Sequence, residues 1–145
     1  MKRDFRELRL RQIARTLSAF DAAKQEPRPQ RGWLRAIREG LGLTLQTVGK
    51  QLGQSRRRIQ EFEEAEANDR ITLHSLRRVA AAMDCELVYA IVPKSGTVSE
   101  LAERRARAQV TEDVRDVEHT MALENQASGN VEELIEEETK RRLTK

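Results

Sequence analysis

The chain has 145 residues, of which 35% are charged and only 3% are aromatic, so its apolar core must be small and mostly aliphatic. This length allows one moderate domain, or a small domain with helical extensions. The charge is uneven: residues 1–62 carry 15 Lys and Arg against 6 Asp and Glu, whereas residues 97–145 carry 8 against 12. A basic front and an acidic back indicate two different partners.

Several classes of site and of protein are disfavoured by the residues present. A single cysteine, Cys85, excludes an internal disulfide, and His74 and His119 are not at metal-ligand spacing, so we expect no metal and no cofactor. The sequence has no apolar run long enough to span a bilayer and no signal-peptide pattern, so we expect a cytoplasmic protein without a membrane partner. We find no nucleophile-base pair and no phosphate-binding glycine loop, which argues against an enzyme.

The first segment, residues 2–24, is predicted to be a basic amphipathic helix. Arginines separate apolar residues at roughly helical spacing, namely Phe5, Leu8, Ile13, Leu17 and Phe20. Such a helix can lie on DNA phosphates, on a membrane surface or on the rest of the protein, and docking on the protein is favoured because the apolar stripe needs covering. Pro27 and Pro29 then predict a linker over residues 26–31, since proline cannot continue a helix.

A compact set of helices is predicted next. The first, residues 33–39, places Leu34, Ile37 and Leu41 on one face. Thr44 is the expected N-cap of the second, and Gly53 can adopt the left-handed conformation that ends it. Ser55 is the expected cap of the third helix, in which Ile59 and Phe62 point inward.

Three consecutive arginines, Arg56, Arg57 and Arg58, open this third helix. The N-terminal end of an exposed helix is where a recognition helix meets base edges, so the pattern indicates a helix-turn-helix. The alternative is a helix hairpin whose arginine cluster only contacts water, because charge runs usually form solvated faces.

A fourth helix and a strand complete this region. Thr72 caps a helix whose predicted buried stripe is Leu73, Leu76, Val79, Ala80 and Met83. Residues 85–93 then read as a β-strand, and since no second strand is predicted, we expect it to pair with its copy in a homodimer. A symmetric dimer would place two recognition helices ~34 Å apart on a palindromic operator. The expected dimerisation residues are Leu87, Val88, Tyr89 and Ile91.

The C-terminal part is predicted to be helical. A long helix from Val98 to about Gln126, capped by Thr97 or Ser99, carries a narrow stripe that needs a groove on something else, formed by Val110, Val114, Val117 and Met121. The last helix, from Val131, has few apolar residues and is expected to fray or to depend on a partner. The expected fold is mainly α: a helix-turn-helix domain at 32–93, preceded by a basic helix and linker at 1–31 and followed by a helical region at 97–145.

Residues 33–83 resemble the Cro/repressor-type, lambda-repressor-like helix-turn-helix family, through WLRAIREGLGLTLQTVGKQLG, QSRRRIQEFE and ITLHSLRRVAAAM. The resemblance implies that Ser55, Arg56 and Arg57 open the recognition helix. By their chemistry the arginines suit guanine and Gln60 suits adenine, while Glu61 can accept from cytosine or orient an arginine. Arg58 can instead meet phosphate. A glutamine that often contacts phosphate in this family is replaced by Leu45, with Gln46 beside it. The candidate DNA-binding residues are Thr44, Gln46, Ser55, Arg56, Arg57, Arg58, Gln60 and Glu61.

Most of the chain resembles the mobile mystery protein A family, through PRPQRGWLRAIREGLGLTL, ITLHSLRRVAAAMDCELVYAIVP and the helical tail that follows. That family is associated with a companion protein that carries a Fic domain, which transfers AMP from ATP to protein hydroxyls. The resemblance therefore implies an antitoxin that also regulates transcription, with the Fic-domain AMP-transferase toxin as its partner.

A short stretch of the tail is relevant to that partner. Thr120, Glu124 and Asn125 match the inhibitory-helix pattern of Fic proteins, in which the glutamate pairs with an active-site arginine. Residues four apart share one face of a helix, so Thr120 and Glu124 would present a hydroxyl and a carboxylate together. So loose a pattern also arises by chance in roughly one chain in ten of this length.

Two functions follow from these patterns. The first is a dimeric antitoxin that represses its own operon, is nucleoid-associated when bound to DNA, and inhibits a Fic-type toxin through the Thr120, Glu124 and Asn125 motif. The alternative is a helix-turn-helix transcriptional repressor whose helical tail is purely structural or dimerising.

Overall fold

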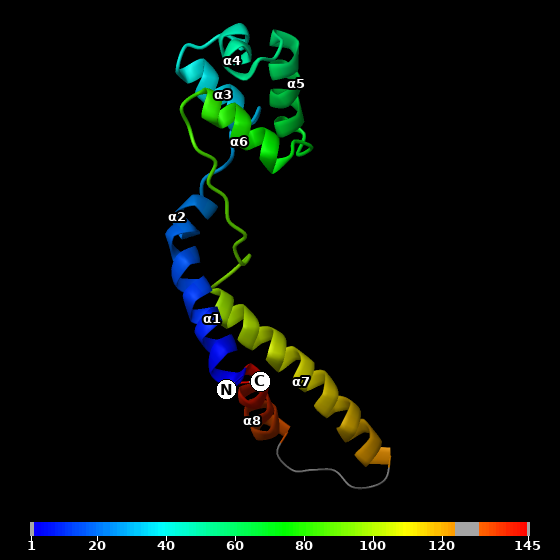
Figure 1. The fold of residues 1–145 in the computed structure, drawn as a ribbon. Coiled ribbons are helices and arrows are strands. Elements are labelled where there is room, and N and C mark those ends of the chain that lie inside the picture. The colour runs from blue at the N-terminus through cyan, green and yellow to red at the C-terminus, as the bar shows by residue number, and fades with distance from the viewer. Residues whose placement is uncertain (1, 124–130, 145) are drawn as a thin grey trace. The chain divides into compact units, whose positions relative to one another are not determined.

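The computed structural model describes the backbone of residues 2–123 and 131–144 and the side chains of residues 5–120 and 132–144. The described elements are helical (Figure 1). In chain order they are α1 (Lys2–Leu17), the 3-10 turn η1 (Ser18–Phe20), α2 (Asp21–Lys24), α3 (Trp33–Gly40), α4 (Leu45–Leu52), α5 (Arg56–Ala67), α6 (Leu73–Ala82), α7 (Val98–Leu123) and α8 (Val131–Leu143).

The chain divides into two compact units. Residues 25–89 form one, which we call the central unit, and residues 1–24 together with 90–145 form the other, the terminal unit. The central unit contains α3 to α6, and the terminal unit contains the first three and the last two elements. The chain therefore enters and leaves the central unit through single connections.

The helices of the central unit begin where side-chain caps permit. Thr44 and Ser55 have extended backbones, and their hydroxyl oxygens accept hydrogen bonds from the backbone N–H of Thr47, at 3.0 Å, and of Arg58, at 3.1 Å. Thr72 caps α6 in the same way by accepting from the N–H of Ser75. These bonds satisfy amides that have no partner inside a helix, and they confirm the three predicted caps.

Apolar residues from all four helices form the core of the central unit. Ile59 and Val48 are almost completely buried. The remaining buried members of this cluster are Leu34, Phe62, Val79 and Met83. Two residues of the predicted stripes are instead exposed: Leu41 by 56% and Leu73 by 45%. Leu41 follows the last residue of α3, and Leu73 is the first residue of α6, so neither lies in the part of its helix that packs on a neighbour.

The terminal unit is held together mainly where α8 packs on the middle of α7. Val110 of α7 is completely buried, and Ile135 and Thr139 of α8 are nearly so. Arg107 pairs with Glu132 at 2.7 Å and Arg142 with Asp113 at 2.5 Å across the same two helices. The predicted apolar stripe of α7 is therefore covered by α8 of the same chain at Val110, although Val117 stays half exposed.

The predicted cap of α7 is confirmed as Thr97. Its hydroxyl accepts from the N–H of Glu100 at 3.1 Å, and its own N–H donates to the Glu100 carboxylate at 2.9 Å. This reciprocal arrangement is a capping box. The predicted continuation of this helix to Gln126 extends past Leu123 and so lies outside the described residues.

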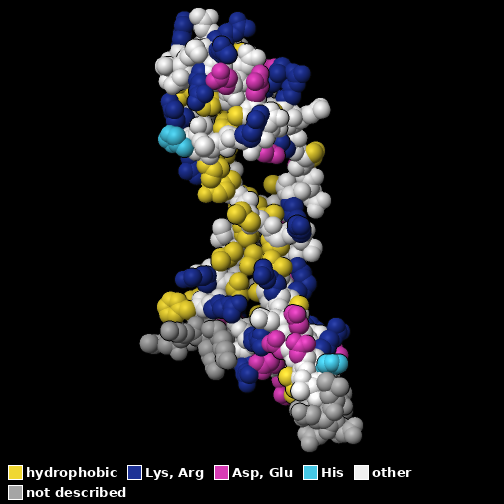
Figure 2. Space-filling view, turned by 90° about the vertical axis from the view of Figure 1, so that its right-hand side faces the viewer, with side chains coloured by type: hydrophobic (Ala, Val, Ile, Leu, Met, Phe, Trp, Pro, Cys, Tyr) yellow, Lys and Arg dark blue, Asp and Glu magenta, His cyan; other side chains and the backbone are white. Residues whose placement is uncertain are grey.

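Helix α1 packs on the first part of α7 with a stripe that agrees only in part with the predicted one. Leu17 and Phe20 of the predicted stripe are half-buried, whereas Phe5, Leu8 and Ile13 are exposed and Leu10 and Ala14 are half-buried instead. The correction has a geometric cause, because Leu10, Ala14 and Leu17 recur at intervals of four and three and so share one helical face. In Figure 2, hydrophobic side chains gather on the terminal unit near the start of α7.

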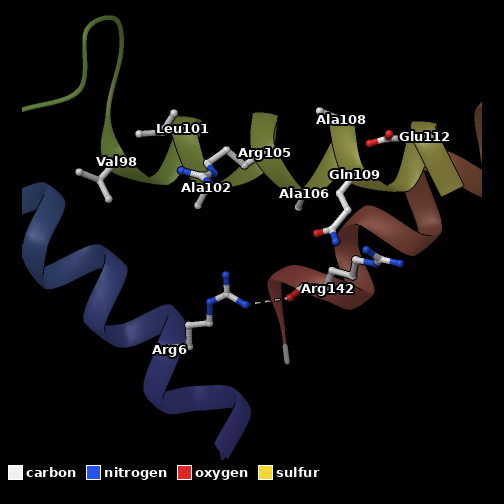
Figure 3. Close-up of a pocket in the computed structure, with 10 residues that line it drawn as sticks. All are labelled: Arg6, Val98, Leu101, Ala102, Arg105, Ala106, Ala108, Gln109, Glu112 and Arg142. Atoms are coloured by element: carbon white, nitrogen blue, oxygen red, sulfur yellow. Dashed lines mark hydrogen bonds between the residues drawn. The ribbon is translucent and has the colours of Figure 1, made fainter.

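The three long helices of the terminal unit border a common groove. Val98, Ala102 and Ala106 point from α7 toward α1, and a guanidinium N–H of Arg6 on α1 donates to the carbonyl oxygen of Arg142 at 3.3 Å (Figure 3). Alanines at this face let the helix backbones approach closely. The groove therefore reflects how α1, α7 and α8 meet.

The strand predicted at residues 85–93 is not confirmed. These residues have no regular secondary structure, and no strand occurs among residues 2–123 and 131–144. An isolated strand has no neighbour in its own chain to complete its hydrogen bonds, so a single copy cannot form the predicted ladder.

Candidate nucleic-acid interface

Two helices and a tight turn create the candidate interface. Helix α4 ends at Gly53, whose φ of 63° is left-handed, and its N–H donates to carbonyl oxygens of the last turn. A Cβ on Gly49 would lie 2.5 Å from the carbonyl oxygen of Gln54, so the chain can turn this closely only because residue 49 has no side chain. Gly49 and Gly53 together allow α5 to follow α4 at close distance. Gly53 was predicted from the sequence, whereas the role of Gly49 depends on a contact across the turn.

The arginine cluster lies in the first turn of α5, and all three side chains are exposed. Arg57 lies 3.5 Å from a carboxylate oxygen of Glu61, and Arg58 lies 3.1 Å from the other. The Arg58 guanidinium also stacks 4.6 Å from the centre of the Phe62 ring. Arg56 has no polar partner among the residues that the structure describes. Glu61 is therefore placed to orient two arginines, while Arg56 is left available.

Helix electrostatics do not explain this cluster. A helix N-terminus carries a partial positive charge, so each cation there is disfavoured by ~0.3–1 kcal/mol when exposed. The first turn of α5 contains no acidic residue that would offset the repulsion. Three arginines at this position therefore cost stability, which is expected where an anionic ligand is bound.

The other predicted site residues occupy the same two helices. Gln46 is exposed in the first turn of α4, one residue past the start of the helix. The amide of Gln60 donates to the carboxylate of Glu64 at 3.3 Å, a long bond that a base edge could replace. Thr44 and Ser55 are exposed too, although their hydroxyls already act as caps. Of the eight predicted residues, six therefore lie at the exposed starts of α4 and α5, and Gln60 and Glu61 lie one turn further along α5.

Two buried acids of α5 position this helix, and sequence patterns did not predict their burial. The carboxylate of Glu63 pairs with Arg38 of α3, and a second bond between them measures 3.2 Å. Glu66 accepts from the backbone N–H groups of Trp33 and Leu34, each at 2.9 Å, and so caps the start of α3. Their spacing of three residues, on the same face as Phe62, was the only signal in the sequence.

The linker contributes a further contact to the end of α5. Arg28 donates to the carboxylate of Asp69 at 2.6 Å and to the carbonyl oxygen of Glu66 at 3.4 Å. A cation near the last carbonyl groups of a helix is favourable because those groups carry partial negative charge. The linker is thus attached to the helix that carries the arginine cluster.

The second predicted motif is described only in part. Thr120 lies on α7 with its side chain exposed, and its hydroxyl donates to the carbonyl oxygen of Asp116 at 2.9 Å. Glu124 and Asn125 lie outside the described residues. The expected pairing of a hydroxyl and a carboxylate on one helical face is therefore a prediction.

The described residues contain neither a candidate metal cluster nor a helix fit to span a membrane. Over residues 2–123 and 131–144, His, Cys, Asp and Glu side chains nowhere gather in a group of three that could hold a metal ion. Within the same ranges, none of the helices combines the length and the apolar character needed to cross a bilayer.

Part of the chain matches a known protein family. Residues 34–89, from α3 through α6 to the segment that follows, match the family model described as helix-turn-helix. Neither the curated proteins nor the solved structures that were compared match the chain. The matched span covers the capped helices, the Gly53 turn and the arginine cluster. Residues 34–89 are therefore similar to a helix-turn-helix domain, and this similarity supports DNA binding by this part of the chain.

Proposed function

We propose that the chain is a DNA-binding antitoxin that represses its own operon and inhibits a Fic-domain AMP-transferase. In this proposal two copies pair through residues 85–93 and place their α5 helices on a palindromic operator. The observation that carries the DNA-binding part is the exposed arginine cluster at the start of α5, which helix electrostatics disfavour and an anionic duplex would stabilise.

In this proposal, some residues at the start of α5 contact base edges of the DNA, and others contact its phosphate backbone. Arg56 has no competing partner in the described part of the chain, and Arg57 has only a long contact with Glu61, so both can turn toward guanine. Arg58 is held by Glu61 and by the Phe62 ring, which suits a phosphate contact. Thr44 and Gln46 lie at the start of α4, where a helix N-terminus can meet another phosphate.

We predict that Arg56→Ala with Arg57→Ala abolishes sequence-selective binding, because each arginine-base contact supplies ~1–3 kcal/mol of discrimination. The measurement compares the affinity for the operator with that for a scrambled duplex at one salt concentration. Arg35→Ala with Arg70→Ala is the matched control, since it removes the same charge from the same unit and should preserve the ratio. If the first variant keeps its selectivity, the assignment of α5 is wrong.

The antitoxin part rests on the resemblance to the mobile mystery protein A family and on the position of Thr120. The exposed Thr120 lies in the last turn of α7, and the proposed inhibitory residues Glu124 and Asn125 follow it in sequence. In the proposal the carboxylate of Glu124 pairs with an arginine of the partner's nucleotide site, and ATP then binds unproductively. Charge-assisted pairs of this kind are strong when bidentate.

We predict that Glu124→Gly restores AMP transfer by a co-expressed Fic-domain partner while operator binding is unchanged. Glu112→Gly is the matched control, because Glu112 is an exposed glutamate of α7 away from the motif and its loss should leave inhibition intact. Incorporation of labelled AMP into protein measures the effect. Full inhibition by the Glu124 variant would exclude the active-site mechanism.

One observation favours the second candidate, a transcriptional repressor with a structural tail. Helix α8 covers Val110 of α7 with Ile135 and Thr139, so part of the tail already has a packing role within the chain. The two candidates differ in the AMP-transfer experiment alone, since both require operator binding.

A further inference from the structure

The segment that follows α6 leaves apolar surface uncovered. Val88 is 67% exposed, Tyr89 55% and Ile91 87%. Within the described part of the chain, no backbone hydrogen bond involves residues 86–92. A run of apolar side chains with free N–H and C=O groups is a template for pairing with another chain.

An apolar groove lies beside this segment in the central unit. It has a volume of about 530 Å³, and α3, α6 and residues 85–88 border it. Its lining includes Trp33, which is half exposed, and Leu87. It also includes Ile37 and Leu76, both partly buried against the core. The groove therefore connects the apolar core of the central unit with residues 85–88.

The burial of the segment indicates which of its faces meets the core. Cys85 and Leu87 are half-buried, while Glu86 and Val88 are exposed. In a strand, alternate residues share one face, so Tyr89 and Ile91 would continue the face of Cys85 and Leu87. In one copy Tyr89 and Ile91 are exposed while Ala90 and Val92 are half-buried, so the regular alternation would be established only when the segment pairs as a strand.

A second copy can cover this face if odd-numbered residues of the two strands are opposite one another, and centring the pair on Val88 is a register that does this. In an antiparallel pair, directly opposite residues lie on the same face. If Val88 lies on the two-fold axis, Tyr89 of one copy is opposite Leu87 of the other, and Ile91 is opposite Cys85. Tyr89 and Ile91 of each copy then extend the apolar surface next to the groove of the other copy.

Charge favours the same antiparallel arrangement. The segment begins with the exposed acids Asp84 and Glu86 and ends with the exposed Lys94. None of the three has an ion-pair partner within the part of the chain that the structure describes. Antiparallel pairing brings the acidic start of each copy near the basic end of the other, whereas parallel pairing would place like charges together.

We infer that the occupant of this face is a second copy of the chain, paired antiparallel through residues 85–91 with Val88 on the two-fold axis. The inference rests on the homodimer of the proposed function and adds its register and its contacts. Tyr89 and Ile91 of each copy pack beside Leu87 and Cys85 of the other, at the edge of the groove that contains Trp33.

The native Cys85 allows the register to be measured, since it is the only cysteine in the chain. In the full-length protein, cysteine replaces Tyr89, Ala90, Ile91 or Val92 one at a time, and mild oxidation is followed by electrophoresis without reductant. A disulfide requires Cα atoms about 4.4–6.8 Å apart, so we expect Ile91→Cys to form dimers several-fold more completely than the other three.

Two further variants serve as internal controls. Ile91→Cys with Cys85→Ser should not cross-link, because residue 91 is then opposite serine and roughly 20 Å from its own copy along the strand. Val88→Cys with Cys85→Ser should cross-link to itself on the axis. A maximum at residue 89, 90 or 92 would overturn the register that we infer.

Sedimentation in reductant separates this inference from the proposed function. If the unmodified chain is a dimer but no position cross-links, the interface lies elsewhere and the inference fails while the dimeric repressor stands. If the unmodified chain is a monomer at concentrations that saturate the operator, both fail. Val88→Pro should convert a dimer into a monomer, since proline removes an N–H at the centre of the ladder, and a persisting dimer would contradict the inference.

Discussion

Single charged residues hold helix α5 in place. The hydrogen bond with Glu63 raises the pKa of Arg38 above its already strongly basic value, even though burial acts in the opposite direction. A base with a raised pKa stabilises the fold below that pKa and loses this contribution only as the pH rises through it. The pair therefore contributes at every pH near neutrality, and it joins α3 to the helix that carries the arginine cluster.

We predict that Glu63→Leu lowers the free energy of unfolding by roughly 3–5 kcal/mol, because it leaves the guanidinium of Arg38 buried without its carboxylate. Chemical denaturation measures the loss. Arg38→Met with Glu63→Leu should recover most of it, since a buried pair replaced by apolar groups is often nearly neutral. A double variant as unstable as the single one would show that the pair itself, and not the unpaired charge, determines the cost.

At the scale of elements, local chemistry explains where the helices begin, and packing explains which faces they bury. Thr44, Ser55, Thr72 and Thr97 each accept the backbone N–H three residues ahead, so the sequence alone places these helix starts. The stripe of α1 could not be assigned in this way, because its apolar residues occupy more than one face and only contact with α7 selects among them.

The same contrast applies to the segment after α6. Its β-branched and apolar composition predicts a strand, yet a strand is completed by hydrogen bonds to a neighbour. The described part of one chain supplies no such neighbour. Helices need no outside partner for their backbone bonds, which is why the helices were predictable from the sequence and a strand pairing is not.

At the scale of the whole molecule, the chain consists of two compact units with separate cores. The core of the central unit includes Ile59 and Val48, and that of the terminal unit centres on Val110 and Ile135. Damage to one core should therefore leave the other largely intact.

We predict that Ile135→Ala destabilises the terminal unit by roughly 2–5 kcal/mol, the usual cost of such a cavity, while selective operator binding is retained if the dimer persists. Hydrogen exchange resolved along the chain should show faster exchange in α7 and α8 and unchanged protection in α3 to α6. Val117→Ala is the control, because Val117 is half exposed and its truncation should change little. Equal loss of protection in both units would show that they unfold together.

The sequence by itself determined the features that depend on neighbours along the chain: the helix caps, the left-handed Gly53, the proline linker and the arginine cluster at the start of α5. These could be predicted because each rests on interactions within a few residues. Only the tertiary structure decided that Glu63 and Glu66 are buried, that Gly49 permits the turn, and that Leu41 and Phe5 are exposed. Burial is set by residues far away in sequence, and a pattern of spacings does not contain their positions.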